Sequence, residues 1–294
     1  MATFSMENVR AVCKHRDAWW TVLLVDPIAV RLTWLVANRT SITPNQITLA
    51  AFALGTGAAG CFAQASAGWL ALGALLYHLG FVLDCVDGKI ARLRGTGSPF
   101  GGWLDFMLDR IRDALCAVAL TGGQFLATGQ AAFLWLGFAI LALDMIRYLN
   151  GPQIAKARRK MTDEAAGGED DDAPAESAEP SGGRCGRPSR YLRVRRALLR
   201  RRVRMHLISG IEFQMAAFIV GPLTGAILPV TVAAGLMLAV FELLIIYRFW
   251  RASRTYACSM TAGTAPRTSA PSPAVVPGTT EVPRQRRPLI DVER

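Results

Sequence analysis

Four carboxylates embedded in apolar sequence constrain this chain more than any other feature. They are Asp84, Asp87, Asp105 and Asp109, within DCVDGKIARLRGTGSPFGGWLDFMLD, and they form two pairs spaced i,i+3 and i,i+4. On helices each pair projects from one face, one turn apart. The apolar run LGALLYHLGFVL precedes the first pair, and LCAVAL follows the second. Ionised carboxylates in such surroundings are costly unless a positive group neutralises them, so they indicate a functional site.

A hard divalent cation is the simplest neutralising group for this cluster. Ligands that are all oxygen select Mg²⁺ first and Mn²⁺ second. Gly88 leaves bare backbone beside the carboxylates, where a bulky ligand can pack. Arg92, one turn further along, can donate charge-assisted hydrogen bonds to a phosphate. The break GTGSP then ends the helix, and Gly101 allows close approach where the next helix begins. These parts suit a metal-bound pyrophosphate between two helix ends.

The motif resembles the signature of a known family. The spacing D-x2-D-G-x2-A-R-x8-G-x3-D-x3-D is present without a departure, on Asp84, Asp87, Gly88, Ala91, Arg92, Gly101, Asp105 and Asp109. It is similar to the signature of the CDP-alcohol phosphotransferases, a family of integral membrane enzymes. The alternative is a polar helical hairpin with incidental acids, but eight fixed positions within 26 residues make the match specific.

The resemblance implies roles for these residues. Asp84, Asp87 and Asp105 would be the principal metal ligands, and Asp109 the catalytic base that also touches a second metal. The implied cofactor is Mg²⁺ or Mn²⁺, bound as two ions. The positions that would admit and hold the CDP group are Asp84, Gly88, Ala91, Arg92 and Gly101. Asn45, in TSITPNQIT, is also expected to touch the nucleotide, because this element precedes the first spanning helix in the family; helix capping is the alternative.

The reaction implied by the resemblance is transfer of a substituted phosphoryl group from a CDP-alcohol to a hydroxyl, with release of CMP, in phospholipid biosynthesis. The expected donor is CDP-diacylglycerol, whose phosphatidyl group would pass to a polar alcohol or polyol phosphate. Two other branches stay open: headgroup transfer from CDP-choline or CDP-ethanolamine to diacylglycerol, and the joining of two soluble polyol substrates. A non-enzymatic membrane scaffold and a transporter are alternatives from other classes. A homodimer is a candidate assembly.

Composition favours a membrane protein. The 294 residues are 52% hydrophobic, with mean hydropathy +0.28 and net charge +11. A membrane protein with basic cytoplasmic segments combines these values readily, whereas a soluble protein seldom does. The six cysteines show no metal-ligand spacing, and the pattern indicates small buried hydrophobes rather than a disulfide framework. The first twenty residues lack the apolar core of a signal peptide.

The expected fold is an all-α integral membrane protein with six transmembrane helices and an N-terminal juxtamembrane amphipathic helix. The six spans are expected at about 46–65, 68–92, 101–127, 130–150, 207–228 and 230–250. They belong to one membrane domain over residues 40–250. Residues 17–39 are interrupted by Asp26, Pro27 and Arg31, which favours the juxtamembrane helix over a kinked span. Residues 1–16 are expected to be mobile.

The loops between these spans differ sharply in charge. AQASAG, LATGQA and LPV, after the first, third and fifth spans, contain no charged residue, and all charged segments fall on the other side. The positive-inside rule therefore places both termini and the Asp84–Asp109 site in the cytoplasm. The chain is expected to be a multi-pass protein of the cell inner membrane.

Two segments are expected to be disordered at least in part. Residues 155–206 form an insert that begins acidic (EAAGGEDDDAPAESAEPSGG) and ends arginine-rich (RYLRVRRALLRRRVR). Contact with anionic lipid headgroups explains the arginines more simply than nucleic-acid binding does, so no nucleic-acid partner is expected. Residues 251–294 form a tail rich in Pro, Ser and Thr.

A few further polar residues lie within or next to the expected spans. Arg147, His206 and Glu212 are expected near the cavity mouth, where they would bind the acceptor; snorkelling at the interface is the alternative for the two basic residues. Glu242 lies deeper and is expected to pair with Tyr247, Gln214 or a hydroxyl.

Overall fold

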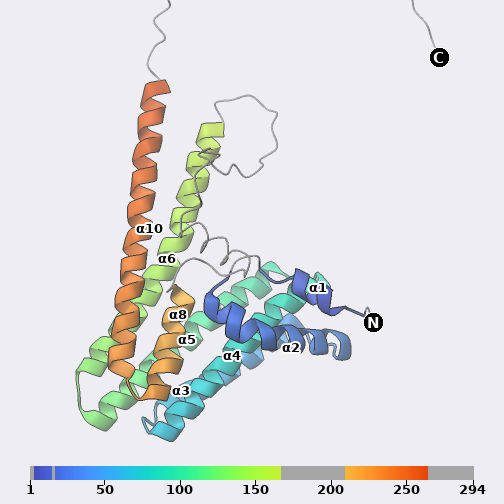
Figure 1. Ribbon diagram of the computed structural model, residues 1–294, viewed down its shortest axis with the longest axis vertical. Helices are drawn as coiled ribbons and strands as arrows, with labels where there is room; N and C mark the ends of the chain where they lie inside the picture. Colours follow the sequence, from blue (N-terminus) through green and yellow to red (C-terminus); the bar gives the residue numbers. More distant parts are fainter. Residues whose placement is uncertain (1–2, 15–16, 167–208, 264–294) are drawn as a thin grey trace, which may run out of the picture. The chain divides into compact units, whose positions relative to one another are not determined.

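The computed structural model describes residues 3–14, 17–166 and 209–263, and the regular elements of this part are all helices. In chain order they are α1 (Met6–Ala11), the π-helical turn η1 (Thr21–Val25), α2 (Asp26–Arg39), α3 (Pro44–Phe62), α4 (Ala67–Arg94), α5 (Pro99–Thr128), α6 (Ala132–Ala166), α8 (Gly210–Met215), the π-helical turn η2 (Ala216–Val220), α9 (Gly221–Thr224) and α10 (Ile227–Gly263) (Figure 1). Residues Met1–Arg251 form one compact unit, which contains every site discussed below; Ala252–Arg294 form a second.

Local sequence signals set the helix ends around the acidic motif. Thr43 and Gln46 form a reciprocal capping box at the start of α3, where Pro44 occupies the first turn. Helix α4 ends at Gly95, whose φ of +65° is the left-handed conformation that glycine adopts most easily. The Ser98 hydroxyl then accepts a hydrogen bond from the Gly101 N–H and starts α5. This short link keeps the two pairs of aspartates on neighbouring helix ends.

Helix α3 packs closely against both α4 and α5. A Cβ on Gly80 would lie 3.1 Å from the Ala51 carbonyl oxygen, and one on Gly123 would lie 2.7 Å from that of Ala63. In a bilayer, helix association depends on such close backbone approach, because lipid is as apolar as the side chains that it contacts. Glycines at these crossings therefore hold α3, α4 and α5 together.

Two elements that follow residue 208, η2 and α9, pack against α4. The ring of Phe218 in η2 lies 4.9 Å from the ring of Tyr77 in α4 and 6.3 Å from that of Phe62 in α3. All three side chains are fully buried. This aromatic cluster closes the core on the side away from α2.

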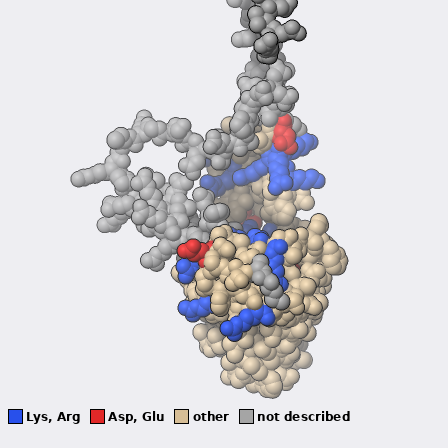
Figure 2. Space-filling view, turned by 90° about the vertical axis from the view of Figure 1, so that its right-hand side faces the viewer, with Lys and Arg blue, Asp and Glu red and all other residues tan. Residues whose placement is uncertain are grey.

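Four helical segments are long and apolar enough to cross a membrane, judged by length and composition: Thr21–Arg39, Ala67–Arg94, Ala132–Asp163 and Ile227–Tyr256. The expected all-helical, membrane-type architecture is confirmed at this level. The segment Thr21–Arg39 satisfies the same criterion although we expect it to be juxtamembrane, so the kinked span stays open. Figure 2 shows Lys and Arg side chains around the middle of the visible face, whereas the lower part is free of charge.

The N-terminus differs from the expectation of a mobile segment. It contains α1, in which Val9 is fully buried. The Phe4 carbonyl oxygen accepts hydrogen bonds of 3.1 Å from both Trp34 Nε1 and Asn38 Nδ2 on α2. These contacts join residues about thirty positions apart, which explains why the local polarity of the segment did not indicate them.

Two helices extend beyond their expected ends. We expected spans to end near 150 and 250, but α6 runs to Ala166 and α10 to Gly263. The expected insert from 155 and tail from 251 therefore begin as helix. The α6 extension is rich in Ala, Arg and Lys, and the α10 extension contains Ala and Arg; these residues favour helix once a span has nucleated it. The remainder of the expected insert and tail, including the arginine-rich run, lies outside the described residues.

The close approach at Gly123 makes a testable prediction. Gly123→Ala should lower the melting temperature in detergent, because its Cβ would meet the backbone at Phe62 and Ala63 rather than a movable side chain. We expect a loss of about 1–3 kcal/mol, typical of overpacking. The neighbouring Gly122→Ala is the matched control, since nothing lies within 4 Å of its Cβ. Equal melting temperatures for the two variants would contradict the packing argument.

Candidate active site

Three of the four aspartates of the motif converge. One carboxylate oxygen from each of Asp84 (α4), Asp105 and Asp109 (α5) lies within 4.8 Å of the others. In addition, Asp105 Oδ1 is buried and has no hydrogen-bond partner among the described residues. Three carboxylates so close together repel one another, and a buried oxygen without a partner is costly. The group therefore fits a divalent cation that prefers oxygen ligands, Mg²⁺ or Mn²⁺.

Asp87 is placed differently from the other three. It is buried and accepts a short hydrogen bond from the Thr48 hydroxyl on α3. Its carboxylate also lines a cavity that adjoins the aspartate cluster. Its role as a metal ligand stays a prediction, since it lies outside the group of three.

A cavity of about 370 Å³ lies between the N-terminal ends of α3 and α5 and the C-terminal end of α4. Its lining residues are Pro44, Asn45, Thr48, Asp87, Gly88, Ala91, Arg92, Gly95, Thr96, Gly97, Ser98, Gly101, Gly102 and Asp105. The volume falls within the range of about 300–1,000 Å³ that small-molecule sites occupy. Of the six residues expected to bind nucleotide, five line this cavity; Asp84 belongs to the adjoining cluster.

The two motif glycines leave space at different points of this cavity. A Cβ on Gly101 would lie 2.9 Å from Asn45 Oδ1, so the absence of a side chain lets α5 approach the start of α3. A Cβ on Gly88 would lie 3.4 Å from Arg92 Nη1. A larger side chain at Gly88 would therefore enter the cavity beside the guanidinium. Arg92 is itself held by its Nε, which donates a 2.9 Å hydrogen bond to the Val12 carbonyl oxygen.

Sequence interpretation missed the charged residues that lie directly beyond Asp109. They form a continuous series of ion pairs through α5 and into α6: Asp109, Arg112, Asp113, Arg110 and Asp144. Gln214 of α8 and Tyr77 of α4 also donate hydrogen bonds to Asp113. The signal was present in the alternating charges of LDRIRDA within an apolar helix. The partners on α6 and α8 carry no local pattern.

The residues expected to bind the acceptor are placed as follows. Arg147 Nη1 lies 2.9 Å from Glu242 Oε1 on α10, and α6 and α10 lie side by side in Figure 1. Asn150 Nδ2 donates to the other Glu242 oxygen at 2.8 Å. The expected pairing of Glu242 with Tyr247 or Gln214 was therefore wrong, because two residues of α6 saturate its carboxylate.

Glu212 and His206 have different outcomes. Glu212 is buried and caps α8, accepting the Ser209 N–H at 2.9 Å and, from across the fold, the Trp19 N–H at 3.1 Å. His206 lies outside the described residues. Acceptor binding by Arg147, His206 and Glu212 stays a prediction.

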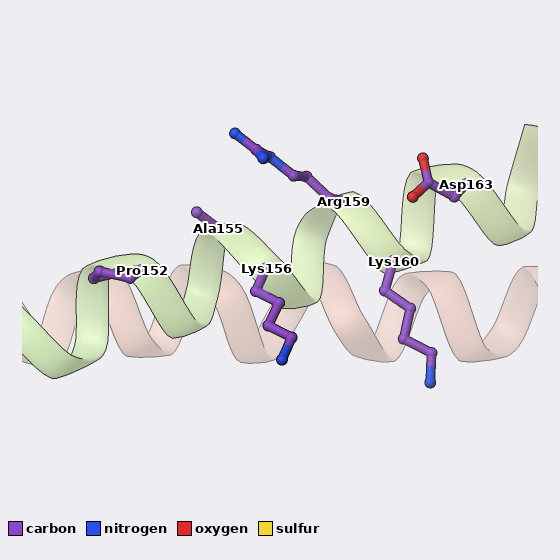
Figure 3. Close-up of a pocket in the computed structure, with 6 residues that line it drawn as sticks. All are labelled: Pro152, Ala155, Lys156, Arg159, Lys160 and Asp163. Atoms are coloured by element: carbon purple, nitrogen blue, oxygen red, sulfur yellow. The ribbon is translucent and has the colours of Figure 1, made fainter. Parts of the chain in front are cut away.

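A larger hollow of about 890 Å³ follows the extension of α6 and is lined by Pro152, Ala155, Lys156, Arg159, Lys160 and Asp163. Figure 3 shows Lys156 and Lys160 projecting to one side of α6 and Arg159 to the other. All its described lining residues come from α6, so no second described element lines it. The cavity beside the aspartates, which three helices enclose, is the better candidate site.

The fold and site define a class: a membrane protein, all-helical in its described part, with an acidic cluster that could hold a metal ion beside a cavity. Residues 41–170 match the family described as CDP-alcohol phosphatidyltransferase. This match includes Asn45 and all eight motif positions. This part of the chain, residues 41–170, is therefore similar to the CDP-alcohol phosphatidyltransferase family.

Several relatives share this part of the chain. Archaetidylinositol phosphate synthase of Methanothermobacter thermautotrophicus is 34% identical over 108 residues, which are 36% of this chain and 54% of that protein. Phosphatidylinositol phosphate synthase of Corynebacterium glutamicum is 35% identical over 99 residues, 34% of this chain and 42% of that protein. The chain therefore spans about half the length, or less, of these two relatives. A crystal structure of Mycobacterium tuberculosis phosphatidylinositol phosphate synthase with CDP-DAG bound aligns over 77% of this chain and 94% of that chain, with TM-score 0.40 and 19% identity.

The cation site makes a prediction that does not depend on activity. Asp84→Asn and Asp105→Asn should each weaken Mn²⁺ binding by at least about tenfold, because even residues that only support metal ligands contribute 10–100-fold. Titration calorimetry on the purified protein in detergent measures this. Asp163→Asn, on the exposed part of α6, is the control and should bind Mn²⁺ like the unaltered protein. Unchanged Mn²⁺ affinity in both Asp84→Asn and Asp105→Asn would contradict a cation site at these aspartates.

Proposed function

We propose that this protein is a metal-dependent CDP-alcohol phosphotransferase that transfers the phosphatidyl group of CDP-diacylglycerol to a polyol phosphate and releases CMP. The observation that carries the proposal is the convergence of the motif. Three of its aspartates lie within 4.8 Å of one another, and its glycines, Ala91 and Arg92 line the adjoining cavity. An incidental polar hairpin would have no reason to bring the acidic and the glycine positions to one place.

The site contains the parts that this chemistry needs. A divalent cation would supply the positive charge that neutralises a pyrophosphate and stabilises a leaving CMP. Asp84, Asp105 and Asp109 would hold it, and Asp87 adds negative charge at the cavity wall. Gly88 and Gly101 leave room for the nucleotide, and the Arg92 guanidinium can donate charge-assisted hydrogen bonds to a phosphate. The acceptor hydroxyl must lose a proton as it attacks, and Asp109 is the base that we assign to this step.

The relatives favour inositol phosphate as the acceptor. The names archaetidylinositol phosphate synthase and phosphatidylinositol phosphate synthase belong to proteins that match about a third of this chain. Both names specify an inositol phosphate product. A polyol phosphate also suits a cavity that Arg92 lines. Transfer of a headgroup to diacylglycerol is the second candidate, and an acceptor screen separates the two.

The proposed topology has six spans with the active site in the cytoplasm. Besides α4, α6 and α10, which satisfy the membrane criterion, α3, α5 and the shorter apolar segment Gly210–Thr224 would also cross the bilayer, and Thr21–Arg39 would lie at its surface. Aspartates and arginines lower the apolarity of α5, and a polar first turn and three glycines lower that of α3. The link between α5 and α6 lies at the same end as the links α3–α4 and α9–α10 in Figure 1. None of these three links contains a charged residue, which supports their placement outside.

Release of CMP tests the activity. The purified protein should release CMP from CDP-diacylglycerol in the presence of inositol phosphate and Mn²⁺ or Mg²⁺. Excess chelator should stop the release of CMP, and added metal should restore it. Glycerol phosphate, serine and diacylglycerol with CDP-choline complete the acceptor panel. Asp109→Asn should lower turnover by about 10²–10⁴-fold, the contribution typical of a general base. No CMP release with any acceptor would contradict the proposed activity, and full activity without metal would contradict the site.

Gly88 tests the location of the nucleotide. Gly88→Leu should raise the KM for CDP-diacylglycerol, because the new side chain would occupy the cavity next to Arg92. Gly60→Leu is the matched control: Gly60 is an exposed glycine of α3, and nothing lies within 4 Å of its Cβ. The two variants should melt at similar temperatures. Equal KM values for CDP-diacylglycerol in the two variants would contradict nucleotide binding beside Gly88.

A further inference from the structure

A chain of alternating charges connects the cation site to α6. Arg112 Nη1 lies 2.8 Å from Asp109 Oδ1, and Arg112 Nη2 lies 3.2 Å from Asp113 Oδ1. Asp113 Oδ2 lies 2.9 Å from Arg110 Nη2, whose Nη1 lies 2.7 Å from Asp144 Oδ2. Three carboxylates and two guanidiniums therefore alternate without a gap. We call Asp109, Arg112, Asp113, Arg110 and Asp144 the ion-pair chain.

The centre of the ion-pair chain is its most buried part. The side chains of Arg112 and Asp113 are 3% and 4% exposed, whereas that of Asp109 is 24% exposed. Asp113 also accepts hydrogen bonds from Tyr77 Oη at 2.9 Å and from Gln214 Nε2 at 2.7 Å. Helices α4, α5 and α8 thus fix the Asp113 carboxylate, and α6 joins them through Arg110 and Asp144.

Asp113 and a glycine of α3 leave the Arg112 side chain little freedom. Arg112 uses Nε and Nη2 on Asp113, which leaves Nη1 for Asp109. A Cβ on Gly55 would lie 2.3 Å from both Cγ and Cδ of Arg112, so the aliphatic stem lies directly against the α3 backbone. The guanidinium carbon lies 5.4 Å from the centre of the Tyr77 ring. The end that meets Asp109 is therefore rigidly placed.

We propose that Arg112 is the positioning residue for Asp109: it holds one carboxylate oxygen and so fixes how the other faces Asp84, Asp105 and the reacting hydroxyl. Asp113 is the anchor through which the surrounding helices fix Arg112. The orientation of Asp109 toward the reacting hydroxyl rests on the proposed function. Its orientation toward Asp84 and Asp105 concerns only the cation site and does not depend on that function. Without Arg112, the Asp109 carboxylate is free to rotate, and catalytic geometry is sensitive to displacements of about 1 Å.

A double-mutant cycle on the full-length protein tests the proposal. Arg112→Lys keeps the charge, but one ammonium cannot bridge Asp109 and Asp113 as the guanidinium fork does. We expect Mn²⁺ affinity and kcat to fall by about 10–100-fold, the effect typical of a residue that orients a metal ligand. The KM for CDP-diacylglycerol should change less than about threefold, since uniform donor binding is retained. In an Asp109→Asn background, Arg112→Lys should cause no further loss of Mn²⁺ affinity.

A residue that only stabilises the fold would behave differently. It would lower Mn²⁺ affinity by the same factor whether or not Asp109 is present, and that result overturns the proposal. Unchanged Mn²⁺ affinity and kcat in Arg112→Lys also overturn it. A wild-type protein that binds Mn²⁺ but releases no CMP contradicts the proposed function instead, and the Mn²⁺ cycle still decides the role of Arg112.

Gly55→Ala provides a second variant that removes no charge. Its new methyl group displaces the Arg112 stem, so the variant should reproduce the loss of kcat and Mn²⁺ affinity. It therefore tests the proposal even if Arg112→Lys fails to fold. Gly60→Ala, on the same helix with nothing within 4 Å of its Cβ, is the control. Wild-type Mn²⁺ affinity and kcat in Gly55→Ala would overturn the proposal.

Discussion

Repulsion among carboxylates in an apolar environment is the constraint on which this structure depends. Asp84, Asp105 and Asp109 approach within 4.8 Å, where water cannot screen them fully. Arg112 meets Asp109, whereas Asp105 Oδ1 has no hydrogen-bond partner among the described residues. The cavity side is left for a cation. Charge that would be a defect in a simple transmembrane bundle is thus the property that makes this one a candidate for phosphoryl chemistry.

Small residues make that arrangement possible. The contacts of α3 with α4 and α5 pass through Gly55, Gly80 and Gly123, each of which lies against a neighbouring backbone or an arginine stem. A side chain at Gly55 would displace the Arg112 stem, so the placement of the guanidinium beside Asp109 depends on this glycine. Packing and electrostatics are therefore not separate here: the glycines of the bundle determine where the charges sit.

The sequence predicted the site better than its surroundings, and the reason is physical. Helical spacing alone places Asp84 beside Gly88, and Asp105 beside Asp109, so the motif could be interpreted from the order of its residues. The helix edges around the motif were also close, because apolar runs and capping residues such as Thr43 are local. The ion-pair chain escaped, since Gln214 is 101 residues from Asp113 in sequence. So did the docking of the N-terminus through Phe4 and the pairing of Arg147 with Glu242. No local pattern encodes contacts between such distant residues.

The short link between α4 and α5 has a consequence for assembly. Because Gly95 to Ser98 join the two helices directly, all four motif aspartates belong to one helical hairpin. Contacts that are local in sequence form with little loss of chain entropy, and chains emerge from the ribosome N-terminus first. The acidic cluster can therefore gather while the C-terminal third of the protein is still unmade. Gln214 becomes available to Asp113 only once α8 has been synthesised, so the motif aspartates can meet before this hydrogen bond fixes Asp113.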